Sequence, residues 1–211
     1  MNTRPKAIIF DYDGVLVDSL AVGIEAYREI ARQLGITGFS SEEEFKHAHI
    51  KPYPEIYQEW KLAPREIVKA TEIYYDIKRK RKGEIALIPG IREVLERLAR
   101  SCRLAVASGM SREIIEERLR SLGVRQHFEC VIGQEDGKKS ESLGIALQRL
   151  SVSPEEALFV GDMVQDTIIG KAAQVKTVIL CSHSWNRKEA LQDAQPDVLI
   201  ERPEQLLGVL A

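Results

Sequence analysis

The sequence of 211 residues contains only three cysteines, and no two of them form a Cys-x-x-Cys pair. Because Cys102, Cys130 and Cys181 lie beside or within apolar segments typical of strands, we expect buried, reduced thiols. No apolar run approaches the length of a membrane span. The first residues, MNTRPK and a short apolar run, lack the length and the small-residue site of a signal peptide. We therefore expect a cytoplasmic protein with no membrane partner.

A large charge of either sign is missing as well. The formal net charge of −2 offers no electrostatic reason to expect nucleic acid or an anionic membrane as a partner. The one notable basic run, KRKRK at residues 78–82, lies at the predicted end of a helix. The helix dipole favours cations there, so we expect solvated side chains rather than a phosphate-binding or nucleic acid-binding segment. Internal repeats are also absent, and nothing in the sequence indicates an oligomeric state.

The most informative stretch lies near the N-terminus. Residues 7–10 (AIIF) form a short, unbroken apolar run, which indicates a strand buried on both faces of a parallel sheet. Asp11 and Asp13 follow at its carboxyl end, where open α/β sheets bind their ligands. Two carboxylates so close together repel each other and need a cation, a shared proton or strong hydrogen bonds. Asp13 and Gly14 are also common turn residues, so this segment alone fits a plain turn too.

The pattern then changes to helices over residues 20–82, with no convincing strand. Ser19 is the expected N-cap of the first helix, and Gly35 is expected to end it. Ser41 and Glu44 form a capping-box pattern before the second. The spacing of apolar residues predicts four helices: one over 20–34, one through 45, a short one around 56–60 and a longer one from 64. We predict that residues 20–82 form an inserted, all-helical domain.

Strands and helices alternate after residue 89. Connections of crossover length favour a parallel sheet, and therefore an α/β fold with a Rossmann-like, three-layer α/β/α core formed by residues 1–19 and 83–211. The apolar runs predict further strands at 103–107, 130–132, 158–160, 177–180 and 198–200.

Polar residues follow several of these predicted strands. Ser108 and Gly109 follow the strand at 103–107, and Asp162 follows the strand at 158–160, with Asp166 one helical turn later. Parallel strands bring their carboxyl ends to one edge, so these residues and Asp11 can meet there. Each also has an ordinary structural explanation, since serine is common in turns and aspartate at helix caps. Their joint occurrence at successive strand ends favours a shared site.

In this order the segments resemble the haloacid dehalogenase superfamily of phosphatases, in the branch with a helical cap inserted after the first strand. The phosphoglycolate phosphatase and β-phosphoglucomutase-like group is the most similar. DYDGVLVDS resembles the first family motif, DxDGTLxDS, with Val15 where threonine is commonest. Ser108 in AVASG matches the second motif, and GDMVQD at residues 161–166 matches the fourth. The resemblance covers nearly the whole chain.

The third motif departs from the family pattern. Many relatives have Lys-Pro just before a helix, whereas this chain has GKKSE at residues 137–141. Lys138 occupies the family position if Ser140 is the N-cap, and Lys139 occupies it if the loop is one residue shorter. Relatives with a Lys-Ser junction slightly favour Lys139, and both alternatives stay open. A lysine pair before a helix is also common on plain solvated surface.

The resemblance implies a mechanism. Asp11 is the nucleophile that becomes an aspartyl phosphate, and Asp13 is first the general acid for the leaving group and then the base for water. Phosphate monoesters are dianions, so the carboxylates need a hard divalent cation such as Mg²⁺ beside them. The resemblance implies that Mg²⁺ is bound by the Asp11 carboxylate, the Asp13 main-chain carbonyl and Asp162, with support from Asp166. It also implies that the phosphoryl group is bound by Ser108, Gly109 and one of Lys138 and Lys139.

We therefore expect a Mg²⁺-dependent phosphatase acting on a small phosphorylated metabolite, such as phosphoglycolate or a sugar phosphate. A phosphomutase would use the same site and return the phosphoryl group to sugar. A dehalogenase is disfavoured, because Asp13 and the metal have no use in displacing halide. A phosphorylation-switch receiver domain would be smaller and lack the helical insert. A binding protein without turnover is disfavoured by the complete set of acids.

The substrate itself is not encoded in any motif. Cap residues are expected to select it, although a packing or surface role is the simpler expectation for each candidate. The candidates are His47, His49, Tyr53, Tyr57, Trp60 and the basic run at 78–82.

Overall fold

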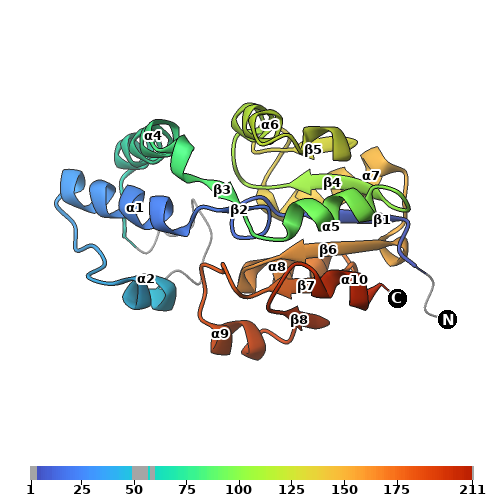
Figure 1. Ribbon diagram of the computed structural model, residues 1–211. Coiled ribbons are helices and arrows are strands. Elements are labelled where there is room, and N and C mark those ends of the chain that lie inside the picture. The colour runs from blue at the N-terminus through green and yellow to red at the C-terminus, as the bar shows by residue number, and fades with distance from the viewer. Residues whose placement is uncertain (1–3, 49–56, 58–59, 211) are drawn as a thin grey trace.

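The computed structural model describes residues 4–48, 57 and 60–210. Strand β1 (Ala7–Phe10) lies in the middle of a six-stranded sheet with the order β5-β4-β1-β6-β7-β8 (Figure 1). All neighbouring strands of this sheet run parallel, which confirms the predicted α/β fold class. The other strands are β4 (Arg103–Ala107), β5 (Cys130–Ile132), β6 (Ala157–Gly161), β7 (Lys176–Leu180) and β8 (Val198–Ile200).

Helices cover both faces of the sheet. Alternate residues of β1 point to opposite faces, so Ile8 and Phe10 belong to one apolar core and Ala7 and Ile9 to another. All four are fully buried, which explains why the run is apolar without interruption. Helices α5 (Ile91–Leu98), α6 (Arg112–Ser121) and α10 (Gln205–Val209) supply the first core, and α7 (Ser142–Leu150) and α8 (Val164–Ala172) supply the second.

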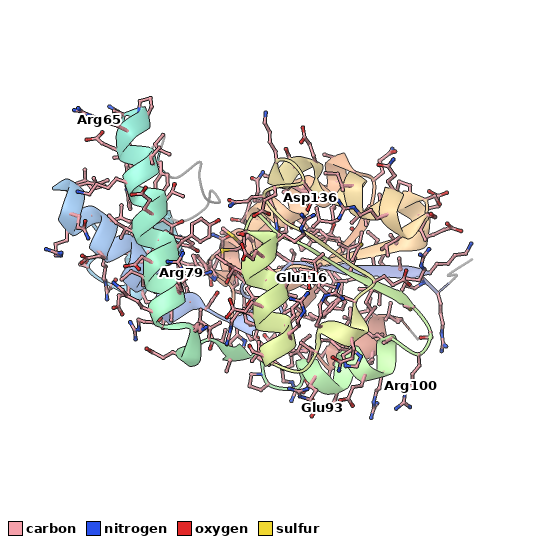
Figure 2. All side chains as sticks on the ribbon, turned by 90° about the horizontal axis from the view of Figure 1, so that it is seen from above. Arg65, Arg79, Glu93, Arg100, Glu116 and Asp136 are labelled. Carbon is pink, nitrogen blue, oxygen red and sulfur yellow. The ribbon has the colours of Figure 1, made fainter. Side chains whose placement is uncertain are left out.

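The segment at residues 20–82 is helical wherever the structure describes it. It contains α1 (Leu20–Leu34), α2 (Glu42–Ala48) and α4 (Pro64–Lys80). Helices α1 and α4 lie side by side at one end of the sheet, beyond the carboxyl ends of its strands (Figures 1 and 2). The chain enters and leaves this region through a short antiparallel pair that the sequence did not predict, β2 (Val17–Asp18) and β3 (Ala86–Leu87). The division into two domains stays a prediction.

Several local expectations change in the structure. Ser19 stands at the N-cap of α1, but its hydroxyl is buried and has no hydrogen-bond partner within the described part of the chain. The helix expected near Ser140 begins at Ser142, after a 3-10 turn. The three cysteines are half-buried rather than buried. The remaining short elements are α9 (Lys188–Asp193) and the 3-10 turns Lys82–Glu84, Arg125–His127, Lys139–Glu141 and Pro154–Glu156.

Some predictions lie outside the described residues, namely those on His49 and Tyr53 and part of the short helix expected around residues 56–60. Among the described residues, no helix is both long enough and apolar enough to cross a membrane.

Candidate active site

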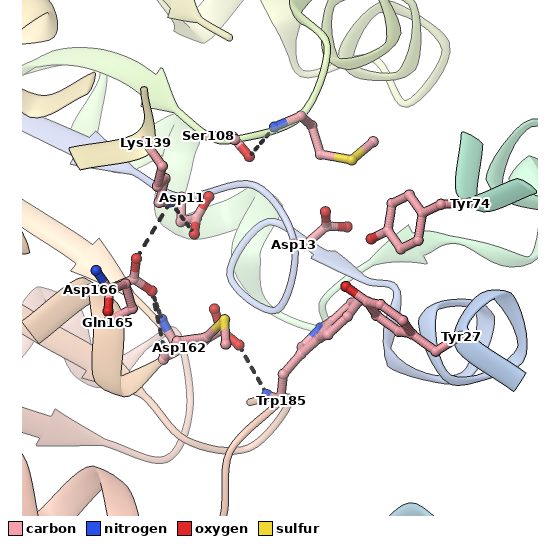
Figure 3. A pocket seen from close by; sticks show the side chains of 13 residues that line it. Asp11, Asp13, Tyr27, Tyr74, Ser108, Lys139, Asp162, Gln165, Asp166 and Trp185 are labelled. Carbon is pink, nitrogen blue, oxygen red and sulfur yellow. Dashed lines mark hydrogen bonds and ion pairs between the residues drawn. The ribbon is translucent and has the colours of Figure 1, made fainter. Parts of the chain in front are cut away.

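The site lies at the carboxyl edge of the sheet, where β1, β4 and β6 end side by side (Figure 3). Asp11 directly follows β1, and its backbone N–H donates to the carbonyl of Val160 in β6 at 2.8 Å. Ser108 directly follows β4, and Asp162 directly follows β6. The sheet topology therefore brings together three polar residues that are far apart in the sequence.

Three buried carboxylates form the centre of the site. One oxygen from each of Asp11, Asp162 and Asp166 lies within 4.8 Å of the others. Asp166 lies in the first turn of α8, where its Oδ2 accepts hydrogen bonds from the backbone N–H groups of Asp162 and Met163, both at 3.0 Å. This side chain thereby holds the loop that carries Asp162.

Burial makes these acids hard to ionise together. It raises the pKa of Asp11 to about 6, with the charge of Asp166 adding to the shift and Lys139 opposing it. Burial and the neighbouring charges of Asp166 and Asp11 also raise the pKa of Asp162 well above its ordinary value. The cluster thus lacks sufficient positive charge. Its oxygen donors and its unmet negative charge fit a hard divalent cation such as Mg²⁺.

Gly14 lets the first loop pass close to this cluster. Its φ of +73° lies in the left-handed region, and a Cβ added to it would lie 2.3 Å from Asp162 Oδ2. No other residue would fit here without moving the Asp162 carboxylate. The backbone that follows Asp13 therefore lies directly against Asp162.

Lys139 is the lysine that reaches the site. Its Nζ lies 2.5 Å from Asp11 Oδ2 and 3.4 Å from Asp166 Oδ1. Burial alone would lower the pKa of Lys139, but the adjacent carboxylates of Asp11 and Asp166 outweigh it and raise the pKa. Lys138 is exposed instead, and its backbone N–H donates to Glu141 Oε2 at 3.1 Å. Of the two lysines that the sequence left open, Lys139 therefore lies beside Asp11 and Lys138 does not.

Ser108 and Gly109 line the same pocket. The Ser108 side chain is buried, and its Oγ accepts a hydrogen bond from the Met110 backbone N–H at 3.3 Å. A Cβ on Gly109 would lie 3.8 Å from the Lys139 Cβ, so the backbone here runs close to the lysine.

Asp13 points away from the three acids and toward the helical segment (Figure 3). Its two carboxylate oxygens accept hydrogen bonds from Lys78 Nζ at 2.7 and 2.8 Å. The expectation that the whole basic run at 78–82 is solvated is therefore wrong for Lys78, whose side chain is only 3% exposed, whereas that of Lys80 is 70% exposed. The missed signal is helical spacing, because Lys78 follows the buried Tyr74 by one turn.

Aromatic rings form the wall opposite the acids. The pocket is lined by Tyr27 of α1, Tyr74 of α4 and Trp185 of the loop after β7. The ring centroids of Tyr27 and Tyr74 lie 5.5 Å apart, and those of Tyr27 and Trp185 lie 6.5 Å apart.

Two of the proposed substrate-selecting residues pack in this aromatic cluster instead. The rings of Tyr57 and Trp60 both contact the Tyr27 ring, with centroids 6.5 and 5.9 Å away. His47 is exposed on α2. These placements agree with the simpler expectation of packing and surface roles.

Comparison with known proteins gives consistent matches. A family model described as haloacid dehalogenase-like hydrolase matches residues 8–180. A phosphorylated carbohydrates phosphatase from Thermotoga maritima is 28% identical over 97% of this chain and 98% of the relative. A phosphoglycolate phosphatase from Synechococcus elongatus is 29% identical over 96% of this chain and 95% of that protein. A haloacid dehalogenase-like family hydrolase from Streptococcus pneumoniae has the same fold, with a TM-score of 0.85 and 24% identity over 98% of this chain and 99% of that one.

The family match includes Asp11, Ser108, Lys139, Asp162 and Asp166, together with most of the chain around them. The predicted resemblance and the prediction of a hydrolase are thus confirmed, and the chain belongs to the haloacid dehalogenase-like hydrolase family.

Proposed function

We propose that this protein is a Mg²⁺-dependent phosphatase that hydrolyses a small phosphorylated metabolite through an aspartyl phosphate. The observation that carries the proposal is the group of three buried carboxylates within 4.8 Å of one another, with the Lys139 ammonium against Asp11. Such a group can hold one divalent cation and one phosphoryl group side by side.

The substrate class follows from the relatives and from the pocket. The two curated relatives described above are named for phosphorylated carbohydrates and for phosphoglycolate. The aromatic wall of Tyr27, Tyr74 and Trp185 offers flat apolar faces to a compact leaving group. A sugar phosphate or a phosphoglycolate-like compound is therefore the proposed substrate.

The metal would be held by the carboxylates of Asp11 and Asp162 and the main-chain carbonyl of Asp13. Asp166 would support them through its hydrogen bonds to the loop at residues 162–163. When bound, Mg²⁺ supplies the positive charge that lets a phosphate dianion approach the carboxylates.

The residues of the chain would then act in two steps. In the first, an Asp11 oxygen bonds to phosphorus, the bond to the leaving oxygen breaks, and Asp13 gives that oxygen a proton. In the second, Asp13 takes a proton from water while the water oxygen bonds to phosphorus. The bond between phosphorus and Asp11 breaks, and inorganic phosphate leaves. Lys139, Ser108 and the Gly109 backbone would hold the phosphoryl oxygens during both steps.

The test is release of inorganic phosphate from a panel of sugar phosphates and phosphoglycolate, with MgCl₂ and with EDTA. An Asp11→Asn variant purified in the same way reveals any contaminating phosphatase. We expect Mg²⁺-dependent turnover of at least one compound by the wild-type protein only. Isomerisation of a sugar phosphate without phosphate release would identify a mutase, and no turnover of any compound would contradict the proposal.

A further inference from the structure

A lysine from the helical segment is buried against Asp13. Lys78 lies in the last turn of α4, 65 residues from Asp13 in the sequence, and its side chain is 3% exposed. Its ammonium donates to both carboxylate oxygens of Asp13, at 2.7 and 2.8 Å. The other basic residues of the run at 78–82 are exposed or half-buried. Within this basic run, Lys78 is therefore the residue that is buried against Asp13.

The surroundings of the Lys78 ammonium are largely apolar. Its Nζ lies 5.2 Å from the centre of the Tyr74 ring and 5.7 Å from the centre of the Trp185 ring. The sulfur of Met110 lies 3.7 Å away. Among the described residues, Asp13 is the one carboxylate within ion-pair distance of Lys78. A buried ammonium with a single carboxylate partner binds it tightly, because leaving it unpaired would cost much more than leaving a surface lysine unpaired.

We infer that Lys78 is a positioning residue that holds the Asp13 carboxyl group in place for proton transfer to the leaving oxygen. The inference rests on the proposed role of Asp13. When Asp13 carries the proton to be transferred, its unprotonated oxygen can still accept from the Lys78 ammonium while the protonated oxygen faces the leaving oxygen. The proton passes from Asp13 to that oxygen as its bond to phosphorus breaks, and Lys78 keeps all its protons. Fixing a proton donor in this way speeds transfer by orientation.

Lys78 and Asp13 come from two different parts of the fold. Asp13 belongs to the loop after β1, whereas Lys78 belongs to the helix that lies over the pocket. The Lys78–Asp13 ion pair therefore joins the edge of the sheet to the helical segment.

The test compares Lys78→Met with Lys80→Met, a matched change of an exposed lysine on the same helix. The readout is kcat/KM with two substrates that differ in the leaving group. p-Nitrophenolate leaves without a proton, whereas the alkoxide of β-glycerol phosphate needs one. For Lys78→Met we expect a loss of about 10- to 100-fold with β-glycerol phosphate and less than about 3-fold with p-nitrophenyl phosphate. Lys80→Met should leave both values unchanged.

Equal losses with the two substrates would mean a merely structural or binding role and would overturn the inference. Lys78→Arg keeps a positive donor and should recover part of the rate with β-glycerol phosphate only. Circular dichroism and thermal melting establish whether each variant folds. If Lys78→Met does not fold, Lys78→Gln replaces it. The loss of kcat/KM must again be larger with β-glycerol phosphate than with p-nitrophenyl phosphate.

A double-mutant cycle separates this inference from the proposed function. In an Asp13→Asn background, Lys78→Met should cause no further loss, because the group it positions is already absent. Additive losses would contradict positioning through Asp13. Full activity of Asp13→Asn alone with β-glycerol phosphate would instead refute the proposed acid, whatever the result at Lys78.

Discussion

The two walls of the pocket are built on different principles. The sheet edge contributes Asp11, Asp162 and Asp166, which are buried beside Lys139 and held by backbone hydrogen bonds. The helical side contributes the rings of Tyr27 and Tyr74. Trp185 completes the aromatic wall from the loop after β7. One wall thus concentrates charge, and the other offers mainly apolar surface.

From this difference we infer separate roles for the charged wall and the aromatic wall. Charges that stabilise a transferring phosphoryl group must stay fixed, and groups next to strand ends are held by the sheet. A surface that selects a leaving group needs shape and not a strong field. Polar contacts that join the two sides include Lys78 to Asp13 and Tyr75 Oη to Gln134 Oε1 at 2.9 Å. We therefore expect substitutions at the sheet edge to abolish the chemistry, and those in the aromatic wall to change substrate preference.

The largest effect should follow Asp11→Asn. This change keeps the shape of the side chain and removes the nucleophile, so we expect phosphatase activity to fall about 10⁴-fold or more. Circular dichroism should show an intact fold. Initial rates of phosphate release measure the effect, and activity within about 10-fold of the wild-type value would exclude Asp11 as the nucleophile.

A pair of lysine substitutions comes next. Lys139→Met removes the ammonium beside Asp11, and we expect kcat/KM to fall by about 10²- to 10³-fold, as when other donors to a transition-state charge are removed. Lys138→Met changes an exposed neighbour and should leave kcat/KM within about twofold. The reverse result would show that Lys138 is the active-site lysine in solution.

The close approach of the first loop can be tested with Gly14→Ala. The new Cβ would displace the Asp162 carboxylate, so we expect about 10- to 100-fold weaker Mg²⁺ affinity, measured by titrating activity with MgCl₂. Gly35→Ala is the matched control. It also has a positive φ, of +66°, but a Cβ there meets nothing within 4 Å. Equal Mg²⁺ affinity in the two variants would argue against a metal beside Asp162.

The raised pKa of Asp11 predicts an effect of pH on stability. Because its pKa in the folded, metal-free protein is about 6, above that of an unfolded chain, raising the pH from about 4 to about 6 costs stability. The free energy of unfolding of the wild type minus that of Asp11→Asn should fall over this window, measured by urea denaturation in EDTA. A difference that rises instead would contradict the burial effect.

Binding of Mg²⁺ should restore the stability that the metal-free protein loses as the pH rises. Cation binding requires ionised carboxylates, so stabilisation by MgCl₂ should be larger at pH 7 than at pH 5. At a concentration of 100 times Kd it reaches about 2.7 kcal/mol. Thermal melting at equal ionic strength with NaCl provides the control, and equal stabilisation by both salts would indicate that no specific site exists.

The smallest effect is expected in the aromatic wall. Trp185→Phe keeps an aromatic ring and the backbone N–H that donates to Asp162 Oδ2 at 3.1 Å. We expect KM to change by about two- to fivefold, with an altered preference among sugar phosphates and little change in kcat. A loss of kcat comparable to that of Lys139→Met would show that this wall takes part in the chemistry.

Local patterns were enough to predict much of the fold and part of the site. The apolar run at residues 7–10 determines a strand covered on both faces, and Asp11 and Asp162 follow such strands directly. The sequence also places Asp162 just before one helix and Asp166 in the first turn of that helix. These features depend on neighbours within a few residues, so the sequence alone contains them.

The sequence by itself therefore determined the sheet, the strand-end acids and the family motifs. Only the tertiary structure decided that Lys139 rather than Lys138 reaches Asp11, because a 3-10 turn at Lys139–Glu141 orients the two side chains differently. It also decided that Lys78 pairs with Asp13 across 65 residues. The physical reason is the same in both cases. A charged side chain takes its partner from whatever the packed chain places beside it, and no local periodicity specifies that neighbour.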